Sequence, residues 1–219
     1  MFSGIVEATS SILQLKDGSS SYQLIVERPR SFDDIGLGDS ICTDGVCLTI
    51  EAFDEKQMQF TLGYETLKVV EFDKAVWLKR KLNLERSIRF GDRVHGHLVT
   101  GHVDGLGVVT KAEAQGDNWL MNVQLPQKFA AQVWQKGSIT LGGVSLTVNG
   151  ISKVLRTHGP VAHEVEVCLI PETIQRTNLT QYRVGEKIHF ETDYMAKALL
   201  RQMQVEQEDH LGEAGTSNV

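Results

Sequence analysis

Short apolar runs separated by turn residues make up most of the chain up to residue 191. Segments such as Tyr22–Val26 and Met58–Leu62 are rich in Val, Ile, Leu and Phe, and their apolar positions recur closer to every second residue than to every 3.6. Asp17-Gly18 and Asp44-Gly45 are typical turn pairs between such runs. The pattern predicts strands at Gly4–Ile12, Tyr22–Val26, Ser40–Thr43, Val46–Phe53, Met58–Leu62 and Trp77–Leu84, with a short helical turn at Glu65–Val69.

The second half of the chain shows the same alternation. It predicts strands at Val99–Lys111, Trp119–Gln124, Ser138–Thr140, Val144–Ile151, Glu164–Leu169 and Lys187–Glu191. Many short strands in each half favour a small closed barrel over an open sheet, because closure removes the unpaired edges that invite aggregation. The fold class is therefore predicted to be all-β.

The pattern changes at Tyr194–Glu206. There Met195, Leu199, Leu200 and Met203 recur at helical spacing, which predicts a C-terminal helix with one apolar stripe. Such a stripe packs either on its own domain or against copies of itself in an oligomer. The tail at 207–219 has few apolar residues and is predicted to be disordered.

The two halves also repeat each other in sequence. Gly45-Val46-Cys47-Leu48-Thr49-Ile50 returns as Gly143-Val144-Ser145-Leu146-Thr147-Val148, at an offset of 98 (143 − 45). Three more blocks follow in the same order: Phe2–Glu7 with Val99–Asp104, Tyr64–Leu67 with Pro171–Ile174, and Leu82–Glu85 with Ile188–Glu191. We predict a duplicated binding domain, at 1–90 and 91–191, followed by a helix at 192–206. Two similar pockets suit a reaction between two similar molecules.

Composition narrows the class of protein. The length of 219 residues fits two domains of about 100 residues each. A net charge of −6 argues against nucleic acid as the partner. No apolar run approaches the roughly 20 residues that span a bilayer, no signal peptide is evident, and the three cysteines are not a disulfide framework. A cytoplasmic protein without membrane partners is the expectation.

The repeated motif and a histidine cluster are the candidates for chemistry. On a strand, Cys47 and Thr49 share one face, and Ser145 and Thr147 share the equivalent face of the second half. Cys47 could instead be a small buried apolar residue, but core packing does not require polar residues at matching places. His102 replaces Ile5 of the first repeat, and histidine suits proton transfer near neutral pH. A zinc site at His95, His97 and His102 has little support, since no acidic or Cys-x-x-Cys partner is nearby in sequence.

Several motifs together resemble riboflavin synthase. They are Met1–Glu7, Gly45–Thr49, Gly96–Gly105, Lys136–Ile139, Gly143–Val148 and Leu169–Leu179, and the resemblance runs from Met1 to about Arg201. It implies two six-stranded Greek-key barrels and a C-terminal helix that assembles a homotrimer, with sites between the N-barrel of one subunit and the C-barrel of its neighbour. It also implies dismutation of two 6,7-dimethyl-8-ribityllumazine molecules to riboflavin and 5-amino-6-ribitylaminouracil, with no metal or redox cofactor. The resemblance also suggests a lumazine synthase as a further partner.

The resemblance also implies residue roles. Cys47 would be a nucleophile or activator, His102 would transfer protons, and Ser145 with Thr147 would be the second-barrel counterparts. Lys136 would hold the second lumazine. The full set expected to bind substrate is Gly4, Ile5, Val6, Cys47, Leu48, Thr49, Gly63, Tyr64, Glu65, Thr66, Gly101, His102, Val103, Lys136, Ser145, Leu146, Thr147, Leu169, Ile170, Pro171, Glu172, Thr173 and Ile174.

The sequence departs from the family pattern at several positions. Gly142 stands where the family usually has Asp, and Asp193 is a candidate to supply the missing carboxylate. Asp44 replaces a usual Asn. A lumazine- or flavin-binding carrier without catalysis is the alternative function, and an oligonucleotide-binding barrel is a third, weakened by the negative charge and the 7% aromatic content.

Overall fold

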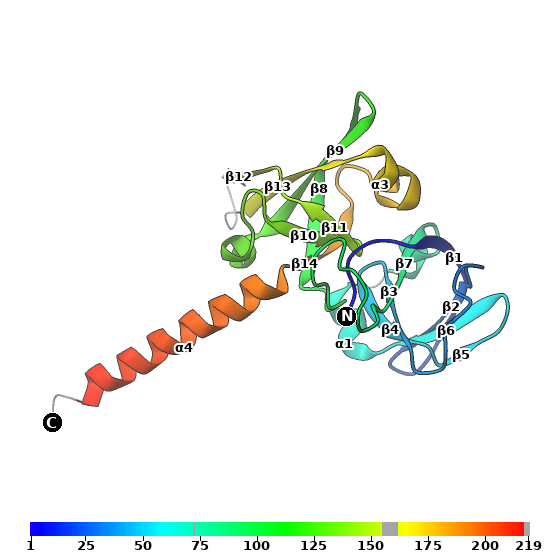
Figure 1. Ribbon diagram of the computed structural model, residues 1–219, viewed down its shortest axis with the longest axis horizontal. Helices are drawn as coiled ribbons and strands as arrows, with labels where there is room; N and C mark the ends of the chain where they lie inside the picture. Colours follow the sequence, from blue (N-terminus) through cyan, green and yellow to red (C-terminus); the bar gives the residue numbers. More distant parts are fainter. Residues whose placement is uncertain (72, 155–161, 217–219) are drawn as a thin grey trace.

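Residues 1–71, 73–154 and 162–216 are described by a computed structural model in which two similar β-domains lie side by side (Figure 1). Each domain holds one seven-stranded antiparallel sheet. The first sheet comprises β1 (Ala8–Asp17), β2 (Tyr22–Glu27), β3 (Ser40–Thr43), β4 (Val46–Thr49), β5 (Ala52–Phe53), β6 (Gln57–Leu62) and β7 (Lys81–Arg86). The second comprises β8 (Gly105–Gln115), β9 (Asn118–Pro126), β10 (Ser138–Leu141), β11 (Val144–Thr147), β12 (Gly150–Val154), β13 (Ala162–Leu169) and β14 (Lys187–Thr192).

The two sheets share one topology. The strand orders β4-β3-β7-β1-β2-β6-β5 and β11-β10-β14-β8-β9-β13-β12 correspond strand for strand. In each, the last strand returns to lie between two earlier ones, as in a Greek key. The sheets curl until β4 contacts β6 and β11 contacts β13. The predicted all-β, duplicated fold is confirmed, with seven strands per sheet instead of six because the short β5 and its counterpart β12 form separate strands.

Each domain has its own apolar core. In β6 the buried residues alternate as Met58, Phe60 and Leu62, which is the period of two that predicted a strand. The second core is built in the same way, with Val165 and Val167 of β13 facing inward. The connection between the last strand of the first sheet and the first strand of the second runs from Ser87 to Asp104, so the predicted domain boundary near residue 90 falls within it.

Each domain also contains short helices. The first domain has α1 (Tyr64–Val69), at the predicted helical turn, and α2 (Lys74–Trp77). The second has η1 (Gln127–Gln132), α3 (Pro171–Arg176) and η2 (Leu179–Gln181). The predicted strand Trp77–Leu84 is wrong at its start, because the Asp73 carboxylate accepts hydrogen bonds from the Ala75 and Val76 N–H groups and caps a helical turn there. The strand β7 begins only at Lys81.

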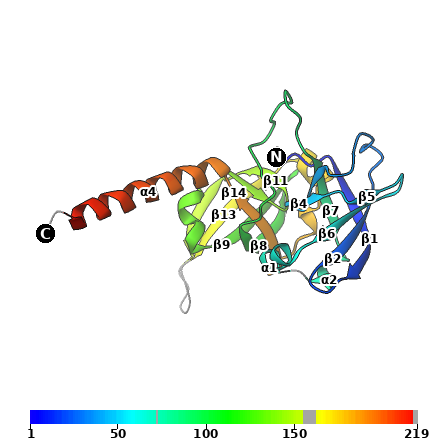
Figure 2. The same cartoon turned by 90° about the horizontal axis from the view of Figure 1, so that it is seen from below.

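The C-terminal helix α4 (Tyr194–Thr216) projects away from both barrels (Figure 2). Its first turns contact η1, and beyond them the helix extends alone. It continues past Glu206, where the sequence analysis ended it, and no proline interrupts residues 194–216. Residues 217–219 of the predicted tail lie outside the described residues. Over the residues that the structure covers, no helix is both long and apolar enough to cross a membrane.

Candidate functional site

The first segments of the two domains are exchanged. Phe2 and Val99 pair with each other, through Phe2 N–H to Val99 O at 2.8 Å and Val99 N–H to Phe2 O at 3.0 Å. Beyond this crossing, Val6 packs into the core of the second barrel, and Val103 packs against the core of the first. Each barrel is therefore covered by a segment that belongs, in the sequence repeat, to the other.

This exchange corrects two predicted strand starts. Residues from Gly4 and from Val99 were expected to begin the first strand of each half, but β1 begins at Ala8 and β8 at Gly105. The cause is backbone conformation, because Gly4 and Gly101 have φ values of +74° and +75°, which an extended strand cannot contain.

The two exchanged glycines support the repeated motif directly. Ser145 donates its backbone N–H to Gly4 O at 2.8 Å, and Cys47 donates its own to Gly101 O at 2.9 Å. A Cβ atom at Gly4 would lie 2.6 Å from Ser145 Cβ, and one at Gly101 would lie 2.7 Å from Cys47 Cβ. Only glycine fits at either position. Cys47 and Ser145, which occupy matching places in the sequence repeat, are thus held by equivalent contacts.

A buried glutamate anchors each glycine. Glu85 of β7 accepts hydrogen bonds from Ser3 N–H (2.7 Å), Ser3 Oγ (2.8 Å) and Gly4 N–H (3.0 Å). Glu191 of β14 accepts the equivalent set from Thr100 N–H (2.8 Å), Thr100 Oγ1 (2.6 Å) and Gly101 N–H (2.9 Å). Burial raises the pKa of Glu85 against the opposing effect of these bonds. The sequence repeat had aligned the two glutamates, but their role emerges only from the exchange.

By domain and by place in the repeat, the candidate residues divide into two equivalent groups, which we call the first and the second half-site. The first comprises Cys47 to Thr49 on β4, Gly63 to Thr66 at the start of α1, and the covering segment Gly101 to Val103. The second comprises Ser145 to Thr147 on β11, Leu169 to Ile174 at the end of β13 and the start of α3, and the covering segment Gly4 to Val6. In both motifs the threonine is exposed and the leucine faces the core. Thr49 and Thr147 are therefore accessible to a ligand, while Leu48 and Leu146 are buried.

Lys136 occupies a special backbone position. Its φ is +67°, its N–H donates to Val148 O at 2.7 Å, and its side chain is exposed just before β10. The equivalent residue in the first domain is Gly38, with φ +87° and an N–H bond to Ile50 O at 2.9 Å. A non-glycine residue in this conformation is uncommon. The lysine is therefore a difference between the two half-sites.

His97 is the residue that the sequence analysis failed to assign. Its Nδ1 lies 2.7 Å from Ser145 Oγ, and its Nε2 lies 3.2 Å from Thr140 Oγ1. Burial lowers the pKa of His97, so the neutral imidazole predominates near neutral pH. The aligned repeat contains no counterpart of His97 in the first domain, since the offset of 97 would place it before Met1.

The two histidines differ in environment. His102 is exposed, and among the described residues its imidazole makes no hydrogen bond or ion pair; only its backbone N–H bonds, to Thr100 Oγ1 at 3.2 Å. Asp193, the candidate for the missing carboxylate, acts on His97 electrostatically, and it also accepts the Met195 N–H at the start of α4. Gly142 (φ +53°) is the counterpart of Asp44 (φ +51°) in the repeat. At this turn the first domain therefore has a carboxylate and the second domain has none.

Comparison with known proteins gives a consistent result. A family model described as "Lumazine binding domain" matches residues 3–87 and again 100–193. The riboflavin synthase of Bacillus subtilis (strain 168) is 32% identical over 92% of this chain and 89% of its own length. That of Photobacterium leiognathi is 30% identical over 100% of this chain and 95% of its own length, and that of Mycobacterium tuberculosis (strain H37Rv) is 34% identical over 93% and 98%.

Solved structures share the fold. The complex of LumP with 6,7-dimethyl-8-(1'-D-ribityl) lumazine has a TM-score of 0.74 and 19% identity, and covers 88% of this chain and 99% of its own. The LumP complex with riboflavin has a TM-score of 0.76 with the same coverage. The resemblance that the sequence motifs indicated is thus confirmed, and the chain belongs to the riboflavin synthase family of lumazine-binding-domain proteins.

Proposed function

We propose that this chain is a riboflavin synthase. It transfers a four-carbon unit between two molecules of 6,7-dimethyl-8-ribityllumazine and gives riboflavin and 5-amino-6-ribitylaminouracil. One observation supports this assignment above the others: the two half-sites are built alike, with Cys47 and Ser145 each held by an exchanged glycine at matching distances. A reaction between two identical substrates needs two similar binding places of this kind.

The half-sites differ where the chemistry requires it. One lumazine must lose a proton from its acidic C7 methyl group, and the other must be attacked at a ring carbon. Neutral His97, hydrogen-bonded to Ser145, can accept a proton in the second half-site. Cys47 supplies a nucleophilic or activating sulfur in the first, and exposed His102 exchanges protons with solvent beside it. Holding two flat rings against each other lowers the barrier further through proximity.

The substrate-binding role falls to the two groups of residues defined above. The starts of α1 and α3 offer backbone groups at Gly63 and Ile170, the residues that precede each helix, and these suit the polar edge of a heterocycle. Lys136, exposed just before strand β10 of the second domain, would hold the second lumazine.

Assembly is part of the proposal. The exposed apolar side chains of α4 include Met195 (63% exposed), Leu199 (63%) and Met203 (48%), on a helix that leaves the barrels. A homotrimer formed through this stripe would cover it. The proposed setting is the cytoplasm, and association with a lumazine synthase is proposed from the family likeness alone.

Spectroscopy of the purified protein with 6,7-dimethyl-8-ribityllumazine tests the function. We expect riboflavin absorbance and fluorescence to appear over time, with release of the pyrimidine product. Tight binding without riboflavin would identify a carrier instead, and no binding would contradict the assignment. Cys47→Ser and His102→Gln should each lower turnover about tenfold or more. Near-normal turnover in either variant would remove that residue from the mechanism.

A further inference from the structure

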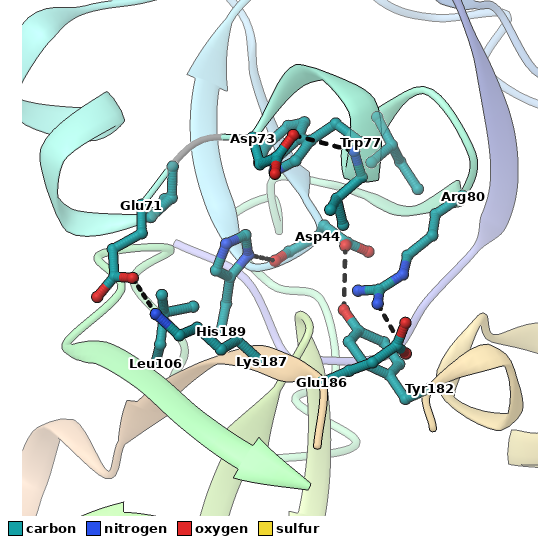
Figure 3. Close-up of a pocket in the computed structure, with 13 residues that line it drawn as sticks. Asp44, Glu71, Asp73, Trp77, Arg80, Leu106, Tyr182, Glu186, Lys187 and His189 are labelled. Carbon is teal, nitrogen blue, oxygen red and sulfur yellow. Dashed lines mark hydrogen bonds and ion pairs between the residues drawn. The ribbon is translucent and has the colours of Figure 1, made fainter. Parts of the chain in front are cut away.

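A cavity of about 350 Å³ lies between the two barrels, apart from both half-sites (Figure 3). None of Cys47, His102 or Ser145 lines it. The first domain contributes Trp77 and Arg80 near α2, and the second contributes Tyr182, Glu186 and His189. Its volume falls in the range of small-molecule sites.

The charges at the rim of the cavity are paired with each other across the domains. Arg80 Nη2 lies 2.8 Å from Glu186 Oε2, and its guanidinium stacks 4.0 Å from the centre of the Tyr182 ring. Lys187 forms an ion pair with Glu71. These ion pairs join the walls that the two domains contribute to the cavity. Both cations at the rim are therefore already paired with a carboxylate.

A buried carboxylate at the floor of the cavity has one oxygen with only a distant partner in the described part of the chain. Asp44 is 5% exposed, and its Oδ1 accepts from Asn83 N–H (3.0 Å) and Asn178 Nδ2 (2.7 Å). Among the residues that the structure describes, its Oδ2 has only the Tyr182 hydroxyl as a partner, at 3.5 Å, well beyond an ordinary O–H···O distance. Figure 3 shows this carboxylate directed toward Tyr182 within the cavity. The oxygen Oδ2 is thus an available acceptor.

The turn itself does not require this carboxylate. Gly142 occupies the same backbone conformation in the second domain and makes the same N–H bond, to His189 O at 2.9 Å, as Asp44 makes to Asn83 O at 2.8 Å. Burial raises the pKa of Asp44, chiefly because the charged form is desolvated. Glycine suffices for this turn, and the structural bonds of the carboxylate use Oδ1, so the cost of burying the acid points to a further role for Oδ2.

His189 supplies a second acceptor. Its Nδ1 lies 3.0 Å from the Asp44 carbonyl oxygen, which can only accept, so Nδ1 carries a proton. In the tautomer protonated at Nδ1 alone, Nε2 is an acceptor, and the described residues give it no hydrogen-bond partner. The Trp77 ring lies 5.8 Å from the His189 ring at an interplanar angle of 52°, and Val70 and Leu82 add apolar wall. The floor therefore combines two acceptors with an indole face.

We propose that this cavity binds a small planar amine, whose N–H groups donate to Asp44 Oδ2 and His189 Nε2 while its ring lies against Trp77. The charge balance favours this class, because the cavity is lined by four carboxylates and by two paired cations, which repel anionic ligands. The four carboxylates are Asp44, Glu71, Asp73 and Glu186, and the cations are Arg80 and Lys187. The site is separate from the proposed catalysis and does not depend on it.

Calorimetric titration of the full chain with 4,5-diaminopyrimidine tests the site, with unsubstituted pyrimidine as the control ligand. We expect saturable binding of the diamine near one per chain and much weaker binding of pyrimidine. Asp44→Asn keeps the Oδ1 bonds but replaces the Oδ2 acceptor with a donor, so it should weaken binding of the diamine at least about tenfold. Glu71→Gln removes the same charge at the rim and should change affinity less than about twofold.

A second variant guards against disturbance of the buried network. Val76 lines the cavity from α2 and is 42% exposed, so Val76→Phe narrows the cavity without touching Asp44. It should also weaken binding, while Cys47→Ser should leave it unchanged. Binding that survives in both Asp44→Asn and Val76→Phe, binding that is lost in Cys47→Ser, or no saturable binding at all would overturn the proposal.

Discussion

At the scale of single residues, the exchanged glycines carry a specific prediction. Gly101→Ala adds a Cβ that meets the Cys47 backbone and side chain at 2.7–3.0 Å, at a φ of +75°. Gly38→Ala has the same left-handed strain, at φ +87°, with nothing within 4 Å. Strain alone costs about 1 kcal/mol, so Gly38→Ala should lower the free energy of unfolding by roughly that amount and Gly101→Ala by clearly more. Denaturant unfolding of both variants checks this, and equal losses would show that the close approach is unimportant.

The buried glutamates should act on the opposite domain. Glu191 of the second barrel fixes Gly101, which supports Cys47 in the first, whereas Glu85 fixes Gly4 beside Ser145. Glu191→Gln loses part of this anchor and should raise the rate of Cys47 alkylation by iodoacetamide several-fold. Glu85→Gln removes an equivalent charge and should leave that rate nearly unchanged.

Background from the other thiols is controllable. Burial raises the pKa of Cys42, which keeps it unreactive, and Cys168 is removed by substitution with Ser in every variant. Equal acceleration in the Glu191 and Glu85 variants would mean general loosening and would contradict the crosswise role.

His97 makes stability depend on pH. Burial lowers its pKa below the ordinary value of 6.5, so between the lowered pKa and 6.5 the unfolded chain binds more protons than the folded chain. The contribution of His97 therefore falls as pH drops through this window. His97→Gln should lose less unfolding free energy than the parent protein between pH 7 and about pH 5.5, measured by denaturant unfolding at each pH. An identical decline in both proteins would contradict the lowered pKa.

At this scale the repeat gave two copies of one signal. Cys47 and Ser145 were predicted from matching motifs, and their backbone N–H groups make matching bonds in the structure, while their roles in the site stay predictions. His97 was missed because its partners Ser145 and Thr140 lie more than 40 residues away along the sequence, and no periodic pattern predicts a contact of that kind. The sequence showed Glu85 and Glu191 only as an aligned pair and did not indicate that they hold Gly4 and Gly101.

At the scale of elements, alternation predicted the strands inside each barrel well, because one face of each strand is buried and the other is not. Alternation failed at the first strand of each domain, because the left-handed conformation of Gly4 and Gly101 breaks the extended chain there. It also failed at Trp77, because the Asp73 cap starts a helical turn in its place. The helix α4 was predicted from its apolar spacing, but its continuation to Thr216 was not, since residues beyond 206 lack the apolar repeat that signalled it.

The apolar stripe of α4 gives the prediction at this scale. Leu199→Glu places a charge in the middle of the exposed stripe and should convert trimers to monomers at micromolar concentration, because a buried unpaired charge costs several kcal/mol. Gln204→Glu adds the same charge at another exposed position of the helix and should leave the assembly intact. Light scattering after size exclusion distinguishes the two, and a monomeric parent protein would contradict the proposed trimer.

At the scale of the whole molecule, the question is whether the two half-sites that react together belong to one protomer or to two neighbouring protomers. Each half-site is complete only with a segment from the other domain, so Cys47→Ser and Ser145→Ala impair different barrels of one chain. If a working site pairs the first barrel of one protomer with the second barrel of its neighbour, a mixture of the two variants contains sites in which both barrels are intact. Sites formed within one protomer would never regain an intact pair.

Refolding the two variant chains together therefore reports on the geometry of the site. Random assembly from equal amounts leaves roughly a quarter of the sites between neighbouring protomers with an intact Cys47 barrel and an intact Ser145 barrel. The mixture should recover about that fraction of parental riboflavin formation, while each variant refolded alone stays near background. Recovery requires the exposed α4 stripe to hold protomers together, so adding Leu199→Glu to both chains should abolish it. Activity no higher than the mean of the separate variants would place the reaction within one protomer.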